Sequence, residues 1–184
     1  MHRLLAALFL LVLTSAAGAT EAGWALLRDG GHVVLLRHAN APGTGEPANF
    51  DIAKCATQRN LSDRGRQQAK RIGALFAARA APVEKVLTSS YCRCADTARL
   101  AFGDALTEID GRLDFLPGDA EGNEEKALAL IEFIRSYTDS ANLVMVLNED
   151  VAQRLVGVAP REAEALIVAR GGETLKVAGR IRFN

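Results

Sequence analysis

The sequence predicts an α/β fold, a three-layer sandwich with helices on both faces of a mainly parallel central sheet. Short apolar runs rich in β-branched residues occur at 32–36, 83–87 and 143–147, and such runs are typical of strands buried on both faces. Segments with apolar residues at helical spacing separate them. Strands that alternate with helices favour a parallel sheet.

The helices are placed by apolar spacing and by the residues at their ends. An amphipathic segment at 21–28 stops before Gly30 and Gly31. Ser62 is a typical N-cap, with Asp63 in the first turn of the helix that follows. Further helices are expected, in chain order, at 93–102, 124–136 and 149–156.

The remaining segments are weaker strand candidates and one long loop. The strand candidates lie at 106–109, 113–116, 165–168 and 175–181. Residues 40–60 are rich in Gly, Pro, Asn and Ala and contain no clear element. Structureless loops of this length in compact domains are usually functional.

Composition indicates one globular domain. The chain has 184 residues, of which 49% are hydrophobic and 24% charged, and its formal net charge is zero. A nucleic-acid partner is not expected, because such proteins usually carry a basic excess. An anionic substrate remains compatible with this composition, since a pocket needs only a few well-placed cations.

The first nineteen residues are typical of a secretory signal. Arg3 lies in a short n-region, an apolar stretch covers 4–13, and the small residues at 17–19 predict cleavage after Ala19. The apolar stretch is too short to cross a bilayer. We therefore expect one domain at 20–184, periplasmic or secreted, without stable membrane insertion after cleavage. A buried N-terminal helix or an uncleaved anchor is the alternative.

The three cysteines are interpreted in the light of export, because an oxidising compartment permits disulfides. A Cys92–Cys94 bond would close a very tight ring, so Cys55 is expected to pair with one of these two. The sequence has no CxxC pair and no cysteine followed by arginine at the spacing of cysteine-based phosphatases. No metal site and no cofactor are expected.

Candidate functional residues follow the three strongest strands, where ligands bind in parallel sheets. Arg37 and His38 follow the first run, Ser89 follows the second and leads to Arg93, and Asn148 follows the third. The carboxyl ends of parallel strands meet at one edge, so these side chains are expected to lie together.

These segments resemble the histidine phosphatase superfamily, the broad group that contains the cofactor-dependent phosphoglycerate mutases. Three motifs occur in the family's order: Leu-Arg-His-Ala at 36–39, Leu-Ser-Asp-Arg-Gly-Arg-Gln-Gln-Ala at 61–69, and a Ser-x-x-x-Arg-x-x-x-Thr-Ala segment at 89–98. Three ordered motifs are far more specific than one Arg-His pair. The resemblance covers the chain from about His32 onward and implies a phosphoglycerate mutase-like fold.

The resemblance also implies roles for individual residues. The histidine that matches His38 attacks phosphorus and becomes a phosphohistidine, and Arg37 and Arg93 hold the phosphoryl oxygens. Ser89 either touches phosphate or only ends its strand. Cys94 occupies a position that is usually small and buried in the family, which makes Cys92 the better partner for Cys55. No metal is needed for this chemistry.

The sequence departs from the family at the second pocket histidine, where Asn148 stands instead. No shift of alignment restores it, because the only histidines are His2, His32 and His38. His32 lies about 20 Å from His38 along an extended strand at ~3.3 Å per residue. Asparagine can donate through its amide but carries no charge, so activity is expected to be reduced.

Two further segments bear on the pocket. Similar proteins carry Pro-x-Ser-Gly-Glu where this chain has a segment that contains Glu162, which would bring negative charge near an anion. A general acid is expected from the loop before the third helix, with Glu121 first and Asp119 second, and a solvated loop acid is the alternative for either.

Together these observations predict an exported phosphomonoester hydrolase that acts on a small phosphorylated substrate through His38. The alternative is a catalytically inactive protein that binds a phosphorylated ligand on the same fold, because Asn148 and the altered segment at 160–164 depart from the family. A purely structural or protein-interaction domain is the third possibility. Such a domain would not require Arg37, His38 and Arg93 together at strand ends.

Overall fold

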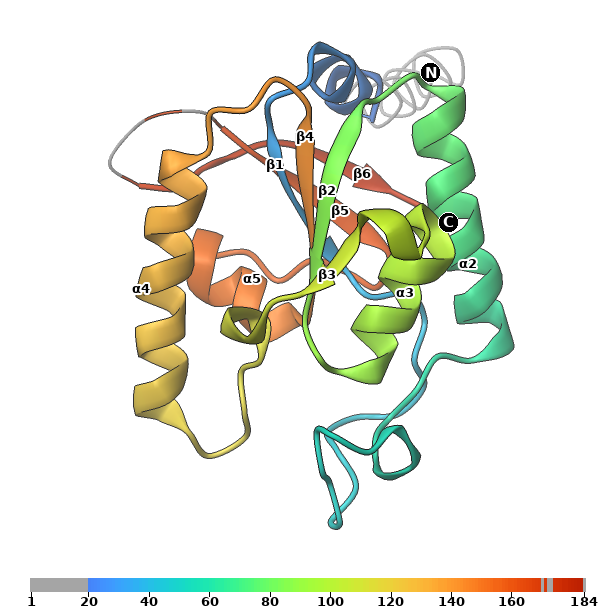
Figure 1. Ribbon diagram of the computed structural model, residues 1–184, viewed down its shortest axis with the longest axis vertical. Coiled ribbons are helices and arrows are strands. Elements are labelled where there is room, and N and C mark those ends of the chain that lie inside the picture. Colours follow the sequence, from blue (N-terminus) through green and yellow to red (C-terminus); the bar gives the residue numbers. More distant parts are fainter. Residues whose placement is uncertain (1–19, 170, 172–173, 184) are drawn as a thin grey trace, which may run out of the picture.

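A six-stranded sheet forms the centre of the molecule (Figure 1). The computed structural model describes residues 20–169, 171 and 174–183. The signal segment expected at 1–19 lies outside the described residues. The strand order is β3-β2-β4-β1-β5-β6, with the bounds β1 Val33–Arg37, β2 Val83–Thr88, β3 Thr107–Ile109, β4 Asn142–Leu147, β5 Glu164–Val168 and β6 Val177–Arg182.

The sheet is mainly parallel, as the sequence predicted. The strands β3, β2, β4 and β1 pair in parallel, whereas β5 runs antiparallel to both β1 and β6. The two runs at the centre, β1 and β4, are almost entirely buried. Their near-continuous apolar sequence reflects this burial, because both faces of a central strand meet helices.

Helices cover both faces of the sheet and complete the three layers (Figure 1). Helix 20–29, α2 and α3 pack with Val34 and Leu36 on one face, whereas α4 and α5 pack with Val33 and Leu35 on the other. The helix bounds are α2 Asp63–Ala78, α3 Cys92–Phe102, α4 Ala120–Ser136 and α5 Glu149–Val156. No helix within the described residues combines the length and apolar character that crossing a membrane requires.

Two expected elements differ from the structure. The strand expected at 113–116 is wrong: a 3-10 helix at Gly111–Leu113 and an extended loop occupy this part of the chain. The Asp110 side chain accepts a hydrogen bond from the Arg112 amide and so begins this turn. Helix α4 begins four residues earlier than expected, because the Asp119 carboxylate caps it by accepting from the Gly122 amide.

The strand register brings the expected site segments to one edge. Arg37 of β1 lies opposite Leu147 of β4, and Thr88 of β2 lies opposite Val146. The residues that follow each strand continue the ladder, since the His38 amide donates to the Leu147 carbonyl at 3.2 Å. The carboxyl ends of β1, β2 and β4 therefore meet at one place.

Candidate active site

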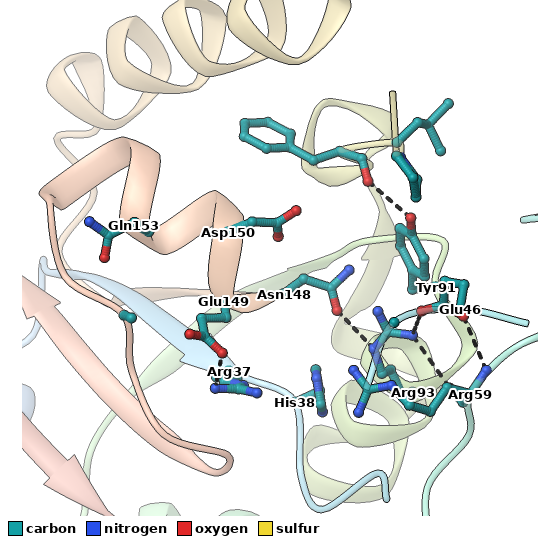
Figure 2. A pocket seen from close by; sticks show the side chains of 15 residues that line it. Arg37, His38, Glu46, Arg59, Tyr91, Arg93, Asn148, Glu149, Asp150 and Gln153 are labelled. Carbon is teal, nitrogen blue, oxygen red and sulfur yellow. Dashed lines mark hydrogen bonds and ion pairs between the residues drawn. The ribbon is translucent and has the colours of Figure 1, made fainter. Parts of the chain in front are cut away.

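A cavity of about 710 Å³ opens at this edge of the sheet. Its walls come from the ends of β1 and β4, from the loop 38–62, and from the first turns of α3 and α5 (Figure 2). The charged and polar residues that line it are Arg37, His38, Glu46, Arg59, Tyr91, Arg93, Asn148, Glu149, Asp150 and Gln153. The remaining lining consists of the apolar residues of the loop 115–117 together with Gly45 and Ala159.

His38 lies at the floor of the cavity with its side chain almost fully buried, at 1% exposure. Its Nδ1 is 2.7 Å from the Ala39 carbonyl oxygen, so Nδ1 carries the hydrogen and Nε2 keeps its lone pair. Burial, assisted by Arg93, Arg37 and Arg59, lowers the pKa of His38 to about 3, against the opposing hydrogen bond to Ala39. At neutral pH His38 is therefore a neutral imidazole.

Arg93 lies beside His38 on the first turn of α3, with 4% exposure. Its Nε donates to the Asn148 Oδ1 at 2.9 Å, and its Nη1 lies 2.5 Å from the Glu46 Oε1. The guanidinium also lies over the Tyr91 ring, 4.5 Å from the centroid. Asn148 thus occupies the expected place in the pocket and orients an arginine through its carbonyl oxygen.

Arg37 lies on the other side of His38 (Figure 2). Its Nη1 forms an ion pair with Glu149 and donates to the Pro160 carbonyl at 2.8 Å. Its buried Nε has no hydrogen-bond partner among the described residues. Both arginines that the sequence assigns to phosphate therefore carry a carboxylate partner in the structure.

Glu46 and Arg59 are cavity residues that the sequence reasoning missed. The Glu46 side chain is 9% exposed, although most of its loop is exposed, and it also accepts from the Arg59 amide at 3.1 Å. Gly45, next to it, has a φ of +68°, a conformation that glycine adopts without strain. The only sequence signal was the length of the loop 40–60, which does not indicate which side chain turns inward.

A disulfide ties this loop to α3. Cys55 and Cys92 are joined, with 5.6 Å between their Cα atoms, and Cys92 directly precedes Arg93. The Gln58 Oε1 accepts from the Cys92 amide at 2.9 Å and strengthens the same connection. Cys94 is a buried free thiol whose pKa is raised to about 12 by burial, so it is inert as a nucleophile.

The structure does not bring every predicted site residue into the cavity. Ser89 is buried, and its hydroxyl donates to the Asp114 Oδ1 at 2.6 Å, so it holds the loop after β3 rather than lining the cavity. Glu162 accepts from the Asn40 side chain and the Ala41 amide. Its charge therefore fixes the start of the loop 40–60 instead of facing the cavity.

The two expected general acids also lie away from the cavity lining. Asp119 is the N-cap of α4 and Glu121 lies in the first turn of that helix, and both are exposed. The nearby part of the cavity wall is formed by Phe115, Leu116 and Pro117. The three carboxylates that do line the cavity are those of Glu46, Glu149 and Asp150. As for metals, no cluster of His, Cys, Asp and Glu in the described part of the chain could hold one.

Comparisons with known proteins identify the family of the chain. The profile of the histidine phosphatase superfamily (branch 1) matches residues 33–157. Among solved structures, YhfR of Bacillus stearothermophilus is 18% identical, with a TM-score of 0.61, over 80% of this chain and 95% of that one. A comparison with curated protein sequences found no match.

Two further structures share the fold. The alpha-ribazole phosphatase of Shigella flexneri is 15% identical, with a TM-score of 0.57, over 80% of this chain and 95% of that one. The protein histidine phosphatase SixA, in complex with tungstate, is 13% identical, with a TM-score of 0.55, over 82% and 96%. Identities this low show the fold alone, whereas the profile match covers most of the chain. The chain belongs to the histidine phosphatase superfamily, branch 1.

Proposed function

We propose that this protein is a phosphomonoester hydrolase that acts through a phosphohistidine at His38. The observation that carries the proposal is the state of His38: a neutral imidazole between two arginines, with Nδ1 held by a carbonyl and Nε2 without a partner among the described residues. A neutral ring nitrogen with a free lone pair is a competent nucleophile.

In the first step, the His38 Nε2 attacks phosphorus and the ester bond to the leaving group breaks. Arg37 and Arg93 present planar donor groups to the phosphoryl oxygens and stabilise their charge as the bond breaks. Water then attacks the phosphohistidine, phosphate leaves, and the neutral imidazole is restored. Hydrolysis rather than mutase chemistry is proposed.

Reduced activity is part of the proposal. Asn148 lacks the positive charge of the family's second histidine, and its Oδ1 is already used by Arg93. Substrate phosphate must also displace Glu46 and Glu149 from the two arginines. Loss of one preorganised donor typically costs ~10²–10³ in rate.

The location is proposed from the sequence. The signal-like segment at 1–19 indicates export to a periplasmic or extracellular space. The Cys55–Cys92 disulfide is compatible with this, since disulfides persist in oxidising compartments. A phosphate ester of the cell envelope is the corresponding substrate class.

Phosphate release from p-nitrophenyl phosphate by residues 20–184 tests the proposal. Wild type is expected to turn over and to form an acid-labile phosphoprotein, whereas His38→Ala is expected to lose both. A His38→Ala variant that retains turnover would contradict the assignment of the nucleophile.

The second candidate is a binding protein for a phosphorylated ligand, favoured by the carboxylate that each arginine already holds. It predicts that wild type binds vanadate or tungstate without turnover, and that Arg37→Ala loses this binding.

A further inference from the structure

We infer that Asp150 is the proton donor to the leaving-group oxygen, a catalytic residue that no sequence motif indicated. The inference rests on the hydrolysis proposed above. An alkoxide is a poor leaving group, so the oxygen that departs from phosphorus needs a proton from an acid within reach. The acid must line the cavity and must be able to hold a proton when substrate binds.

Among the described residues, three carboxyl groups line the cavity, and two of them are already paired with arginines. Glu46 lies 2.5 Å from the buried Arg93, and Glu149 forms an ion pair with Arg37. Both carboxylates therefore already have a guanidinium partner. Asp150 differs, because no arginine, lysine or histidine in the described part of the chain lies within ion-pair distance of it.

The position of Asp150 suits an in-line displacement. It lies in the first turn of α5, two residues after Asn148, and Figure 2 shows its side chain on the far side of Asn148 from His38. In an in-line displacement the leaving oxygen departs opposite the nucleophile. A group on the wall across from His38 is therefore where the departing oxygen needs its proton.

The surroundings of Asp150 favour its protonated form. The cavity walls raise the pKa of its carboxyl by desolvation, and the neighbouring Glu149 acts in the same direction. The Val151 amide, which donates to the Asp150 Oδ1 at 2.9 Å, and Arg93 act in the opposite direction without cancelling the effect. Asp150 is nevertheless an exposed residue, which allows it to exchange its proton with water.

The proton balance closes over one turnover. As the ester P–O bond breaks, its electron pair goes to the oxygen, and Asp150 donates its proton to form the alcohol. Water attacks the phosphohistidine and departs with both of its protons as dihydrogen phosphate, and the Asp150 carboxylate regains its proton from solvent. Phosphate leaves, the His38 Nε2 recovers its lone pair, and Asp150 is again protonated.

The test compares two leaving groups in the chain of residues 20–184. Asp150→Asn is assayed with p-nitrophenyl phosphate, whose phenolate departs without protonation, and with glycerol 2-phosphate, whose alkoxide needs a proton. The expected kcat on glycerol 2-phosphate falls by about 10²-fold or more, while that on p-nitrophenyl phosphate changes by less than about 3-fold. Asp119→Asn and Glu121→Gln are the matched controls and are expected to leave both activities unchanged.

Other results separate failure of this inference from failure of the proposed function. One such result is that wild type hydrolyses both esters while Asp150→Asn lowers both activities equally or lowers neither. In that case Asp150 is not the proton donor, and the proposed hydrolase function is unaffected. If Asp119→Asn or Glu121→Gln shows the selective loss, the donor lies on α4. If wild type hydrolyses neither ester, the proposed hydrolase function is wrong, and the catalytic role of Asp150 is wrong as well.

Discussion

Glu46 places a carboxylate beside Arg93, where phosphate binding is proposed. It brings a negative charge to Arg93 in an almost fully buried position, and the Arg59 amide holds its second oxygen. With phosphate bound as proposed, an incoming phosphate must take this place. The affinity for a small oxyanion is therefore expected to be lower than two arginines beside a neutral histidine would otherwise produce.

Glu46→Gln is expected to raise the affinity for orthovanadate about tenfold, because the amide can still accept a hydrogen bond but no longer neutralises Arg93; tenfold corresponds to about 1.4 kcal/mol. Calorimetric titration measures the change. Glu124→Gln, which removes the exposed ion pair with Arg154, is the matched control. Equal affinities in wild type and Glu46→Gln would contradict this role of Glu46.

Asn148 is the second residue that is proposed to limit the activity. Asn148→His is expected to raise kcat for p-nitrophenyl phosphate by ~10-fold or more, because an imidazolium donates a charge-assisted hydrogen bond to the phosphoryl group. Steady-state kinetics with Asn148→Ala as the control measures the gain. If histidine and alanine at this position give the same rate, the missing charge is not what limits the enzyme.

The site residues differ in how far the sequence predicts them. Arg37, His38 and Arg93 lie at the ends of strands or in a motif that follows one, and the parallel sheet brings them together. Glu46 and Arg59 belong to a loop without regular periodicity, and their contacts depend on how that loop folds over the cavity. Asp150 lies in the first turn of α5, and the sequence alone does not show that this part of the helix faces the cavity.

At the scale of elements, the disulfide connects the loop 40–60 to α3 across a sequence separation of 37 residues. Replacing both cysteines by serine is expected to lower the free energy of unfolding by about 2–4 kcal/mol, because the unfolded chain regains the freedom of a closed loop. Urea unfolding measures this, and reduced wild type is expected to match the variant. A reductant that still destabilises the double variant would point to another cause.

The elements themselves follow the apolar pattern closely where burial is strong. The central strands and the helices α2 and α3 lie where their periodicity places them. The prediction of a strand at 113–116 was wrong because Leu113 and Phe115 are apolar and buried without belonging to the sheet. They pack in the α4 layer from a loop, and a short apolar run does not distinguish these two kinds of burial.

For the whole molecule, the buried His38 links stability to pH. The native state keeps it neutral, with a pKa of about 3, whereas the unfolded chain binds a proton near the ordinary value of 6.5. As the pH falls from 6.5 toward 3, the unfolded state binds more protons, so stability falls over this range.

His38→Asn is expected to remove this contribution, whose slope reaches at most about 1.4 kcal/mol per pH unit. Urea unfolding of wild type and variant between about pH 4 and about pH 7 measures the difference in slope. Parallel curves for the two proteins would show that His38 takes up a proton in the folded state as readily as in the unfolded chain.

The bond between Cys55 and Cys92 also has a consequence for timing. Arg93 follows Cys92 directly, and Glu46 and Arg59 lie on the loop that Cys55 anchors. A chain that has not yet been oxidised lacks the covalent link between these two walls of the cavity. With export as proposed, the newly made precursor would reach full competence only after leaving the reducing cytoplasm, and phosphate esters inside the cell would be spared.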